Sequence, residues 1–233
     1  MHNRPALILA SGSPRRRALL TELGLDFRVA AADVDESALP GESPADLVVR
    51  LSRSKGRAIA ERYPGQPVLA ADTVVVLGEE ILGKPSGPAQ AVEMLTALRG
   101  RRHAVFTAVS LLRSGGPAGN LAPTGSPQVD PRLSCSHVWI RNFSDREIRD
   151  YVATGDPLDK AGAYAIQHPV FAPVERWDGC YTAIMGLPLR AVGELLLEAG
   201  LAPAALDVIA VCERQSGRCC LRGGQTGCSD QGY

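Results

Sequence analysis

An apolar stretch with an aspartate at its centre constrains this chain more than any other feature. Residues 68–77 read Val-Leu-Ala-Ala-Asp-Thr-Val-Val-Val-Leu. Such a run is typical of a β-strand that is buried on both faces inside an α/β sheet. A buried carboxylate is costly unless it is paired, hydrogen-bonded or bound to a metal. The run therefore predicts a central strand, in which Asp72 is either a functional carboxylate or a structural one bonded to backbone at a bulge or strand end.

Size and charge limit the class of protein. The chain has 233 residues, of which 45% are hydrophobic, and this suits one large α/β domain or two small lobes. The formal net charge is +0. Because no overall positive field exists, we do not expect the protein to bind a nucleic-acid polymer through bulk charge.

No segment has the length of a membrane span or of a signal peptide. The apolar segment near the N-terminus, residues 6–10, is too short for the core of a secretion signal. No later stretch is long and apolar enough to cross a bilayer. We therefore expect a cytoplasmic protein without a membrane partner.

Strand and helix patterns alternate along the chain. Strands are predicted at 6–10, 26–32, 68–77, 103–112, 133–142 and 170–177. Helices are predicted at 14–23, 44–63, 88–99, 145–155 and 188–199. Ser13, Ser43 and Ser144 are the expected N-caps of three of them.

Two segments lack a regular pattern. Residues 114–131 are rich in Gly, Pro, Ser and Asn, which indicates a loose surface loop. From about residue 202 the periodicity fades into a short helix at most, and residues 215–233 are polar and Gly-rich. We therefore expect one domain at 1–201 and a largely disordered tail at 202–233.

The turn after the first strand has the composition of an anion site. Ser11-Gly-Ser13-Pro-Arg15-Arg16-Arg17 joins a strand end to a helix start. Backbone N–H groups and the positive end of the helix dipole meet at such a junction, and hydroxyls and guanidiniums add donors for phosphate oxygens. Three arginines against the helix dipole favour an external anion over a merely capped helix with a basic first turn.

Three lysines and one further acid could complete such a site. Lys55 lies on the apolar stripe of its helix, where it either enters a site or snorkels at the stripe edge. Lys84 lies between Gly and Pro in a tight loop, and Lys160 lies in a Gly/Ala-rich segment. Glu36 is a loop acid that is solvated by default. Each residue alone is weak evidence.

Together these residues indicate a polyphosphate site with a divalent metal. Acids would hold the metal or activate water, and the cations would neutralise phosphate oxygens. A Walker A sequence is absent, so the chain is not a P-loop kinase or GTPase. The motifs H-E-x-x-H, G-x-S-x-G and G-x-G-x-x-G are absent as well.

Five blocks in this order resemble the Maf family of nucleoside triphosphate pyrophosphatases. They are Ser11-x-Ser13-Pro-Arg-Arg16, Ala71-Asp-Thr-Val-Val75, Gly83-Lys-Pro85, Asp159-Lys-Ala-Gly-Ala-Tyr-Ala-Ile-Gln167 and Met185-Gly-Leu-Pro-Leu189. The resemblance spans roughly residues 6–200. It implies an α/β fold with an elongated mixed β-sheet, flanking helices and two lobes around a cleft, related to the inosine triphosphatases.

The resemblance also implies roles for individual residues. Asp72 matches the proton acceptor of the family, while Arg15, Thr73 and Gln167 match its substrate-discriminating positions. The remaining matches line the phosphate and metal region, with Glu36 and Asp72 as the metal ligands: Ser11, Ser13, Arg16, Glu36, Lys55, Lys84 and Lys160. The long insertion at 114–131 and the tail after 201 have no counterpart in the family pattern.

The expected activity follows from the same resemblance. It is hydrolysis of nucleoside triphosphates, dTTP and UTP above all, to the monophosphate and pyrophosphate with Mg²⁺ or Mn²⁺. The expected partner is the nucleotide, and a homodimer is compatible with the sequence. Two rivals stay open: a pyrophosphatase for modified nucleotides such as 7-methyl-GTP, and a nucleotide-binding regulator of cell division.

Overall fold

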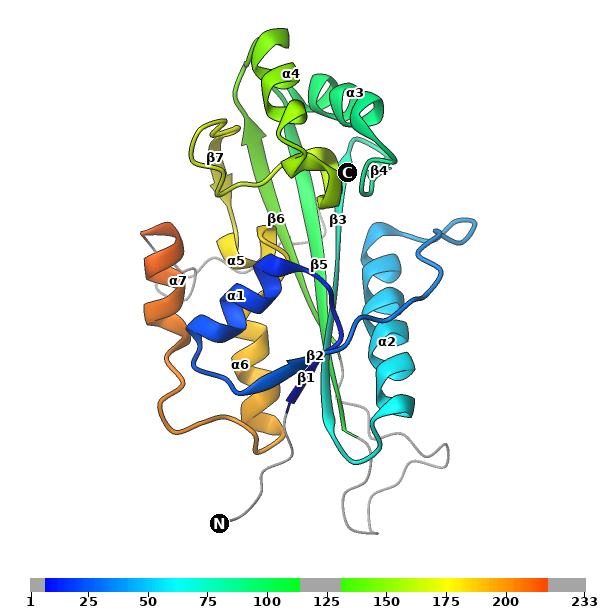
Figure 1. The fold of residues 1–233 in the computed structure, drawn as a ribbon, viewed down its shortest axis with the longest axis vertical. Helices are drawn as coiled ribbons and strands as arrows, with labels where there is room; N and C mark the ends of the chain where they lie inside the picture. Colours follow the sequence, from blue (N-terminus) through cyan, green and yellow to red (C-terminus); the bar gives the residue numbers. More distant parts are fainter. Residues whose placement is uncertain (1–6, 114–130, 218–233) are drawn as a thin grey trace.

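The computed structural model describes residues 7–113 and 131–217 (Figure 1). Almost all of the predicted loop at 114–131, and residues 218–233 of the predicted tail, lie outside this part. Among the described residues, no helix combines the length and the apolar character that a bilayer crossing requires.

A mixed seven-stranded sheet forms the centre of the molecule, with strand order β2-β1-β3-β5-β6-β7 and with β4 paired to β3. The strands are β1 (Leu7–Leu9), β2 (Phe27–Val29), β3 (Pro67–Leu77), β4 (Glu80–Leu82), β5 (Arg102–Arg113), β6 (Arg132–Ile140) and β7 (Val174–Asp178). Strand β1 is parallel to both β2 and β3, and the other pairs are antiparallel. The predicted α/β class with a mixed sheet is confirmed.

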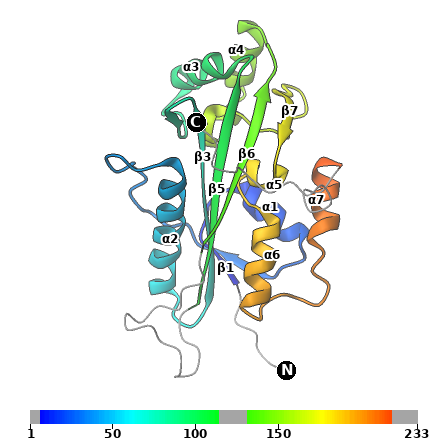
Figure 2. The same cartoon turned by 180° about the vertical axis from the view of Figure 1, so that it is seen from behind.

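Helices cover both faces of this sheet (Figures 1 and 2). They are α1 (Pro14–Glu22), α2 (Pro44–Arg62), α3 (Pro88–Leu98), α4 (Asp145–Ala153), α5 (Tyr181–Ile184), α6 (Leu189–Glu198) and α7 (Val208–Ser216), with 3-10 turns η1 (Asp156–Asp159) and η2 (Ala161–Ala163). Helix α2 packs on one face, and α1, α6 and α7 lie on the opposite side. Helices α3 and α4 lie together at the far end of the sheet.

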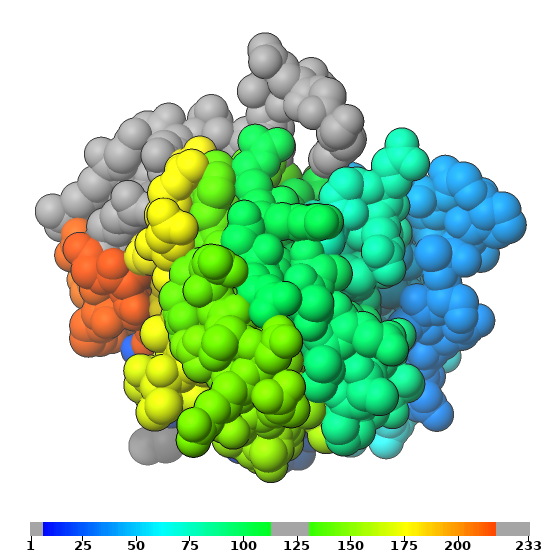
Figure 3. All heavy atoms as spheres, turned by 90° about the horizontal axis from the view of Figure 1, so that it is seen from above, coloured from blue at the N-terminus to red at the C-terminus, as the bar shows by residue number. Residues whose placement is uncertain are grey.

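The long strands β3, β5 and β6 connect two lobes of an elongated molecule (Figure 1). One lobe has its core between β1, α1 and α6, and the other has its core between α3, α4 and the distal halves of the strands. Viewed from above, the α3–α4 end faces the reader, and the blue residues that precede and begin α2 stand beside it (Figure 3). The expected division into two lobes is therefore present.

One edge of β3 is left uncovered between its two partners. Strand β1 pairs with β3 as far as Leu69, and β4 begins to pair with it at Val75. Within the described part of the chain, no strand pairs with residues 70–74 on this edge. The opposite edge is paired continuously with β5 over the same residues. Side chains that point to either face of β3 can therefore be reached from this gap.

The described strands are shorter than expected at two places. Strand β2 occupies 27–29 of the predicted 26–32, because only β1, itself short, is beside it. Strand β7 begins at Val174 and not at residue 170. The preceding residues form turns in which the carbonyls of Phe171 and Ala172 accept hydrogen bonds from Arg141.

The structure corrects the expectation of a disordered tail for part of its length. Residues 208–216 form α7, which begins at the cap Asp207. Val211 and Cys212 are 2% and 4% exposed, and they belong to the same apolar core as Leu20 of α1. The short helix that the sequence allowed in this region is present, extends to Ser216, and is stabilised by this packing.

Ending the chain after Leu201 should therefore destabilise the domain. The deletion removes the buried side chains of Val211 and Cys212, and the burial of such a side chain is worth about 1.5–3 kcal/mol. We expect a melting temperature about 5–15 °C below that of a matched chain ended after Gly217, which keeps α7. Circular dichroism melts of the two proteins measure the difference. Equal melting temperatures would show that α7 contributes no stability.

Candidate active site

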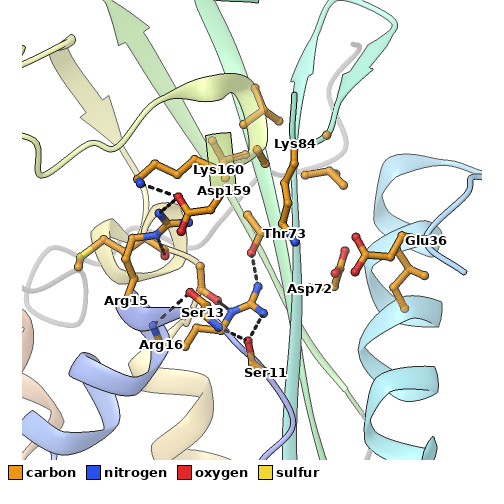
Figure 4. Close-up of a pocket in the computed structure, with 18 of the residues that line it drawn as sticks. Ser11, Ser13, Arg15, Arg16, Glu36, Asp72, Thr73, Lys84, Asp159 and Lys160 are labelled. Carbon is orange, nitrogen blue, oxygen red and sulfur yellow. Dashed lines mark hydrogen bonds and ion pairs between the residues drawn. The ribbon is translucent and has the colours of Figure 1, made fainter. Parts of the chain in front are cut away.

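A cavity of about 760 Å³ opens at the carboxyl end of β1, beside the uncovered edge of β3 (Figure 4). The chain leaves β1 for α1 on one face of the sheet and leaves β2 for α2 on the other. Ligands of α/β proteins bind where connections diverge in this way. The cavity wall contains every residue that the family resemblance assigned to the site: Ser11, Ser13, Arg15, Arg16, Glu36, Lys55, Asp72, Thr73, Lys84, Lys160 and Gln167.

The open edge explains why the neighbours Asp72 and Thr73 both line one cavity. Successive side chains of a strand point to opposite faces of the sheet. Asp72 therefore points toward α2 and Thr73 toward α1, and the gap in the edge joins the two sides (Figure 4). A ligand in this cavity can contact both residues across the edge of β3.

Asp72 is the acid at the bottom of the cavity. It is 5% exposed, and its Oδ1 accepts a hydrogen bond from Lys55 Nζ at 2.5 Å. The same ammonium lies 2.6 Å from Glu36 Oε1. Of the two interpretations of Lys55, snorkelling is thus excluded: the side chain is 10% exposed and bridges two carboxylates.

Helix α2 can deliver Lys55 to this place because the next residue is glycine. A Cβ atom on Gly56 would lie 2.2 Å from Leu112 Cδ1 of β5. A larger residue would therefore require Leu112 or the helix to move. The close approach of α2 is what brings Lys55 within reach of Asp72.

The two carboxylates differ in their electrostatic surroundings. Burial raises the pKa of Asp72, and the positive charges of Lys55 and Arg16 partly offset this rise. Burial also acts to raise the pKa of Glu36, but the hydrogen bond from Lys55 and the charge of Lys84 outweigh it, and the pKa is lowered. The two carboxylates that share Lys55 are therefore shifted in opposite directions.

The first turn of α1 faces the cavity. Ser13 is the N-cap, whose Oγ accepts a hydrogen bond from the Arg16 backbone, and Ser11 Oγ accepts one from the Ser13 backbone at 3.2 Å. Pro14 at the first helical position has no N–H to satisfy. Arg17, the third arginine of the motif, is exposed and does not line the cavity.

Arg16 is held from three sides. Its Nε donates to the Gly186 carbonyl at 2.8 Å, its Nη1 to Ser11 Oγ at 3.1 Å and its Nη2 to Thr73 Oγ1 at 3.2 Å. Gly186 has a φ of +105°, and a Cβ there would lie 3.4 Å from Thr73 Oγ1. The Met-Gly-Leu-Pro-Leu block thus supports Arg16, a role that its sequence did not indicate.

Lys84 and Lys160 differ, although the sequence suggested the same role for both. Lys84 has no ion-pair partner within the described residues, and it extends into the cavity near Asp72 (Figure 4). Lys160 Nζ contacts the Asp156 carbonyl, Asp156 Oδ1 at 3.0 Å and Asp159 Oδ1 at 2.6 Å. Lys160 is 6% exposed and is thus largely neutralised by its own segment.

Arg15 lies at the side of the cavity away from Asp72 (Figure 4), and Gln167 also lines the cavity. Arg15 donates to the Met185 carbonyl at 3.4 Å and lies 3.7 Å from Asp159 Oδ1. Gln167 lines the cavity, and no partner of its side chain amide is recorded within the described residues. Its donor and acceptor are therefore available to a ligand.

Three further wall or supporting residues were missed in the sequence. Tyr164 lines the cavity, and its hydroxyl lies 2.7 Å from His103 Nε2. Burial lowers the pKa of His103 to about 3, so this imidazole is neutral. Thr107 supports Thr73 from β5 at 3.0 Å. Polar residues at alternating strand positions were the only signal that could have identified His103 and Thr107.

The carboxylates of the cavity could supply only part of a divalent cation's coordination. No group of three or more His, Cys, Asp or Glu side chains with metal-site geometry occurs among the described residues. Glu36 and Asp72 nevertheless present oxygens around one ammonium, and Mg²⁺ commonly takes one or two carboxylates together with substrate phosphates. The residues present fit a metal that binds with a polyphosphate, and do not fit a closed protein cage.

Comparison with known proteins agrees with the family resemblance of the five sequence blocks. A family model described as Maf-like protein matches residues 6–199. The dTTP/UTP pyrophosphatase of Anaeromyxobacter dehalogenans strain 2CP-1 is 48% identical over 196 residues, which cover 84% of this chain and 95% of the relative. The dTTP/UTP pyrophosphatase of Symbiobacterium thermophilum is 43% identical over 197 residues, or 83% and 94% of the two chains.

A HAM1 protein from Coxiella burnetii is a distant structural match, at 17% identity and a TM-score of 0.38 over 71% of this chain and 88% of the other. That likeness is too low to add to the assignment. The family model and the close relatives extend over both lobes and over all five sequence blocks that build the cavity wall. On this basis the chain belongs to the Maf family.

Proposed function

We propose that this protein hydrolyses nucleoside triphosphates to the monophosphate and pyrophosphate, with dTTP and UTP as the favoured substrates. The observation that carries the proposal is a buried carboxylate, Asp72, in one cavity with the first turn of α1 and the ammonium of Lys84, which are donors to phosphate. The substrate class rests on the relatives, several of which are named dTTP/UTP pyrophosphatase.

In this proposal Asp72 is the general base. A water molecule beside its carboxylate loses a proton to it and forms a bond to the α-phosphorus. The bond between that phosphorus and the bridging oxygen then breaks, and pyrophosphate leaves with the electron pair. Lys55 keeps Asp72 ionised at neutral pH, and burial makes the carboxylate a stronger base than an exposed one.

Positive groups on two sides of the cavity stabilise the charge that develops on the phosphates. The backbone donors at the start of α1 and the ammonium of Lys84 are available for this purpose. Arg16 is already bonded to three protein oxygens, so its contribution is a fixed positive charge more than a new hydrogen bond. Lys160 contributes little, because two carboxylates neutralise it.

Glu36 and Asp72 would hold a Mg²⁺ or Mn²⁺ ion together with the phosphates. When bound, such an ion neutralises phosphate charge and lowers the pKa of a coordinated water. Lys55 lies between the two carboxylates, and its positive charge would offset their mutual repulsion when no ion is bound.

Replacing the base should stop turnover without unfolding the protein. Asp72→Asn cannot accept the proton, so we expect pyrophosphate release to fall by about 10²–10⁴-fold. The matched control is Asp150→Asn on the exposed face of α4, which should keep the wild-type rate. A circular dichroism spectrum shows whether each variant folds. If folded Asp72→Asn keeps more than about a tenth of the rate, another group is the base.

Substituting Lys55 should lower the stability of the protein, whereas substituting Lys84 should lower turnover. Lys55→Ala leaves two carboxylates without their partner, and breaking such a buried pair costs about 3–5 kcal/mol. Its melting temperature should fall by about 5–15 °C. Lys84→Ala breaks no ion pair of the described residues and should melt within about 2 °C of the wild type, while turnover drops by about 10–100-fold. A folded Lys84→Ala protein with normal kinetics would remove Lys84 from the site.

Base preference should depend on Gln167. Its amide N–H can donate to a carbonyl oxygen at the imide edge of thymine or uracil. We expect Gln167→Ala to lower dTTP and UTP turnover more than purine turnover, measured as pyrophosphate release with and without Mg²⁺ or Mn²⁺. Faster wild-type hydrolysis of GTP or 7-methyl-GTP would contradict the pyrimidine assignment but not the reaction. Full activity in excess chelator would contradict the proposed requirement for a divalent metal.

A further inference from the structure

A buried hydroxyl beneath the cavity fixes the direction of hydrogen bonds at its wall. Thr107 of β5 is 0% exposed and pairs directly with Thr73 of β3 across the sheet. Its Oγ1 lies 3.0 Å from Thr73 Oγ1 and donates to the Ala183 carbonyl at 2.9 Å. Thr73 Oγ1 also accepts from Arg16 Nη2 at 3.2 Å.

The positions of both hydroxyl protons follow from these contacts. A carbonyl oxygen can only accept, so the single proton of Thr107 points to Ala183. Thr107 Oγ1 can then only accept from Thr73, which commits the proton of Thr73 to this bond. A guanidinium can only donate, so one lone pair of Thr73 takes the Arg16 N–H. Thr73 is left with one lone pair and with no proton for a ligand.

We propose that Thr107 is a positioning residue that holds Thr73 as a hydrogen-bond acceptor toward the nucleotide. The group of the nucleotide that meets Thr73 must then be a donor. The N3–H of uracil and thymine has this character, whereas N3 of cytosine carries a lone pair. Thr107, although out of contact with any ligand, thereby favours uracil and thymine over cytosine. This inference rests on the proposed function and deepens it.

Thr73 lies at the boundary between a charged and an apolar part of the cavity, since Arg16 of α1 is bonded to it and apolar side chains lie beside it. Phosphate oxygens are acceptors at neutral pH and cannot pair with a hydroxyl whose proton is already used. The cavity wall on the Thr73 side includes the apolar side chains Val75 and Ile184 and the ring of Tyr164. The acids and the ammonium groups of Lys55 and Lys84 lie toward the other face of β3 (Figure 4). A flat ring fits beside the apolar side chains, and the phosphates fit between the start of α1, Arg16 and Lys84, so Thr73 faces the edge of the base.

The test compares kcat/KM for UTP and CTP, which differ in the ring edge and share the sugar and phosphates. The wild type should favour UTP by at least about tenfold, because a mismatched acceptor leaves buried polar groups unpaired. Thr107→Val removes the hydroxyl at nearly constant shape and frees the Thr73 proton to turn toward a ligand. The UTP:CTP ratio should then fall by about fivefold or more.

Two variants control for the loss of a buried hydroxyl. Thr107→Ser keeps the donor and should restore the wild-type ratio. Ser110→Ala removes another buried hydroxyl of β5, one that is bonded to Ser52 at 2.7 Å and not to Thr73. It should lower stability while keeping the ratio. An equal fall of the ratio in Ser110→Ala and Thr107→Val would overturn the inference.

A double substitution tests whether Thr107 acts through Thr73. In a Thr73→Val background the acceptor is gone, so adding Thr107→Val should not change the UTP:CTP ratio further. An undiminished effect in that background would overturn the inference, and so would an unchanged ratio in Thr107→Val alone. Calorimetric binding of the α,β-imido analogues of UTP and CTP to the same variants should give the same ordering without turnover.

The wild type keeps the inference testable even if Thr107→Val does not fold. Equal hydrolysis of UTP and CTP by the wild type would overturn it while leaving the pyrophosphatase reaction in place. Release of no pyrophosphate from any triphosphate would instead refute the proposed function. The two failures are therefore distinguishable in one assay.

Discussion

The gap in the edge of β3 is the constraint on which the rest of the site depends. Since β1 stops at Leu69 and β4 starts at Val75, residues 70–74 are paired on one side only. A strand that is fully paired would place Asp72 and Thr73 in separate compartments on opposite faces. Here both side chains open into one cavity, and the site therefore combines a charged face with a more apolar one.

Most charged side chains of the cavity, Lys84 excepted, are bonded to another group in the described part of the chain before any ligand binds. Asp72 and Glu36 share Lys55, and Lys160 is bonded to Asp156 and Asp159. The guanidinium of Arg16 is bonded to the Gly186 carbonyl. Buried charges require such partners, because an unpaired one costs several kcal/mol. The consequence is that the cavity is already organised, and a ligand meets groups whose orientations are set by the protein.

Most of the fold and the composition of the site could be predicted from the sequence, for identifiable reasons. Apolar runs and caps such as Ser13 and Ser144 depend on neighbouring residues, and the structure has both caps as expected. The gathering of Ser11, Asp72 and Gln167 in one cavity followed from the family blocks. The ion-pair partner of each lysine could not be predicted. Nothing in the residues next to Lys55 and Lys160 shows which carboxylates lie beside them in space. The full extent of helix α7 was missed for a related reason: its stability comes from contacts with residues far away in the chain.

The position of α7 has a consequence for how the protein is made. Val211 and Cys212 pack in one core with Leu19 and Leu20 of α1, and Gln215 donates to Glu22 at 2.7 Å. The first helix, which supplies one wall of the cavity, is thus completed by residues that leave the ribosome last among those described. During synthesis Leu19 and Leu20 therefore lack part of their final packing until α7 has been made. The cavity wall that α1 supplies gains its full stability only after translation has passed Gln167, the last candidate site residue, by some fifty positions, to Gly217.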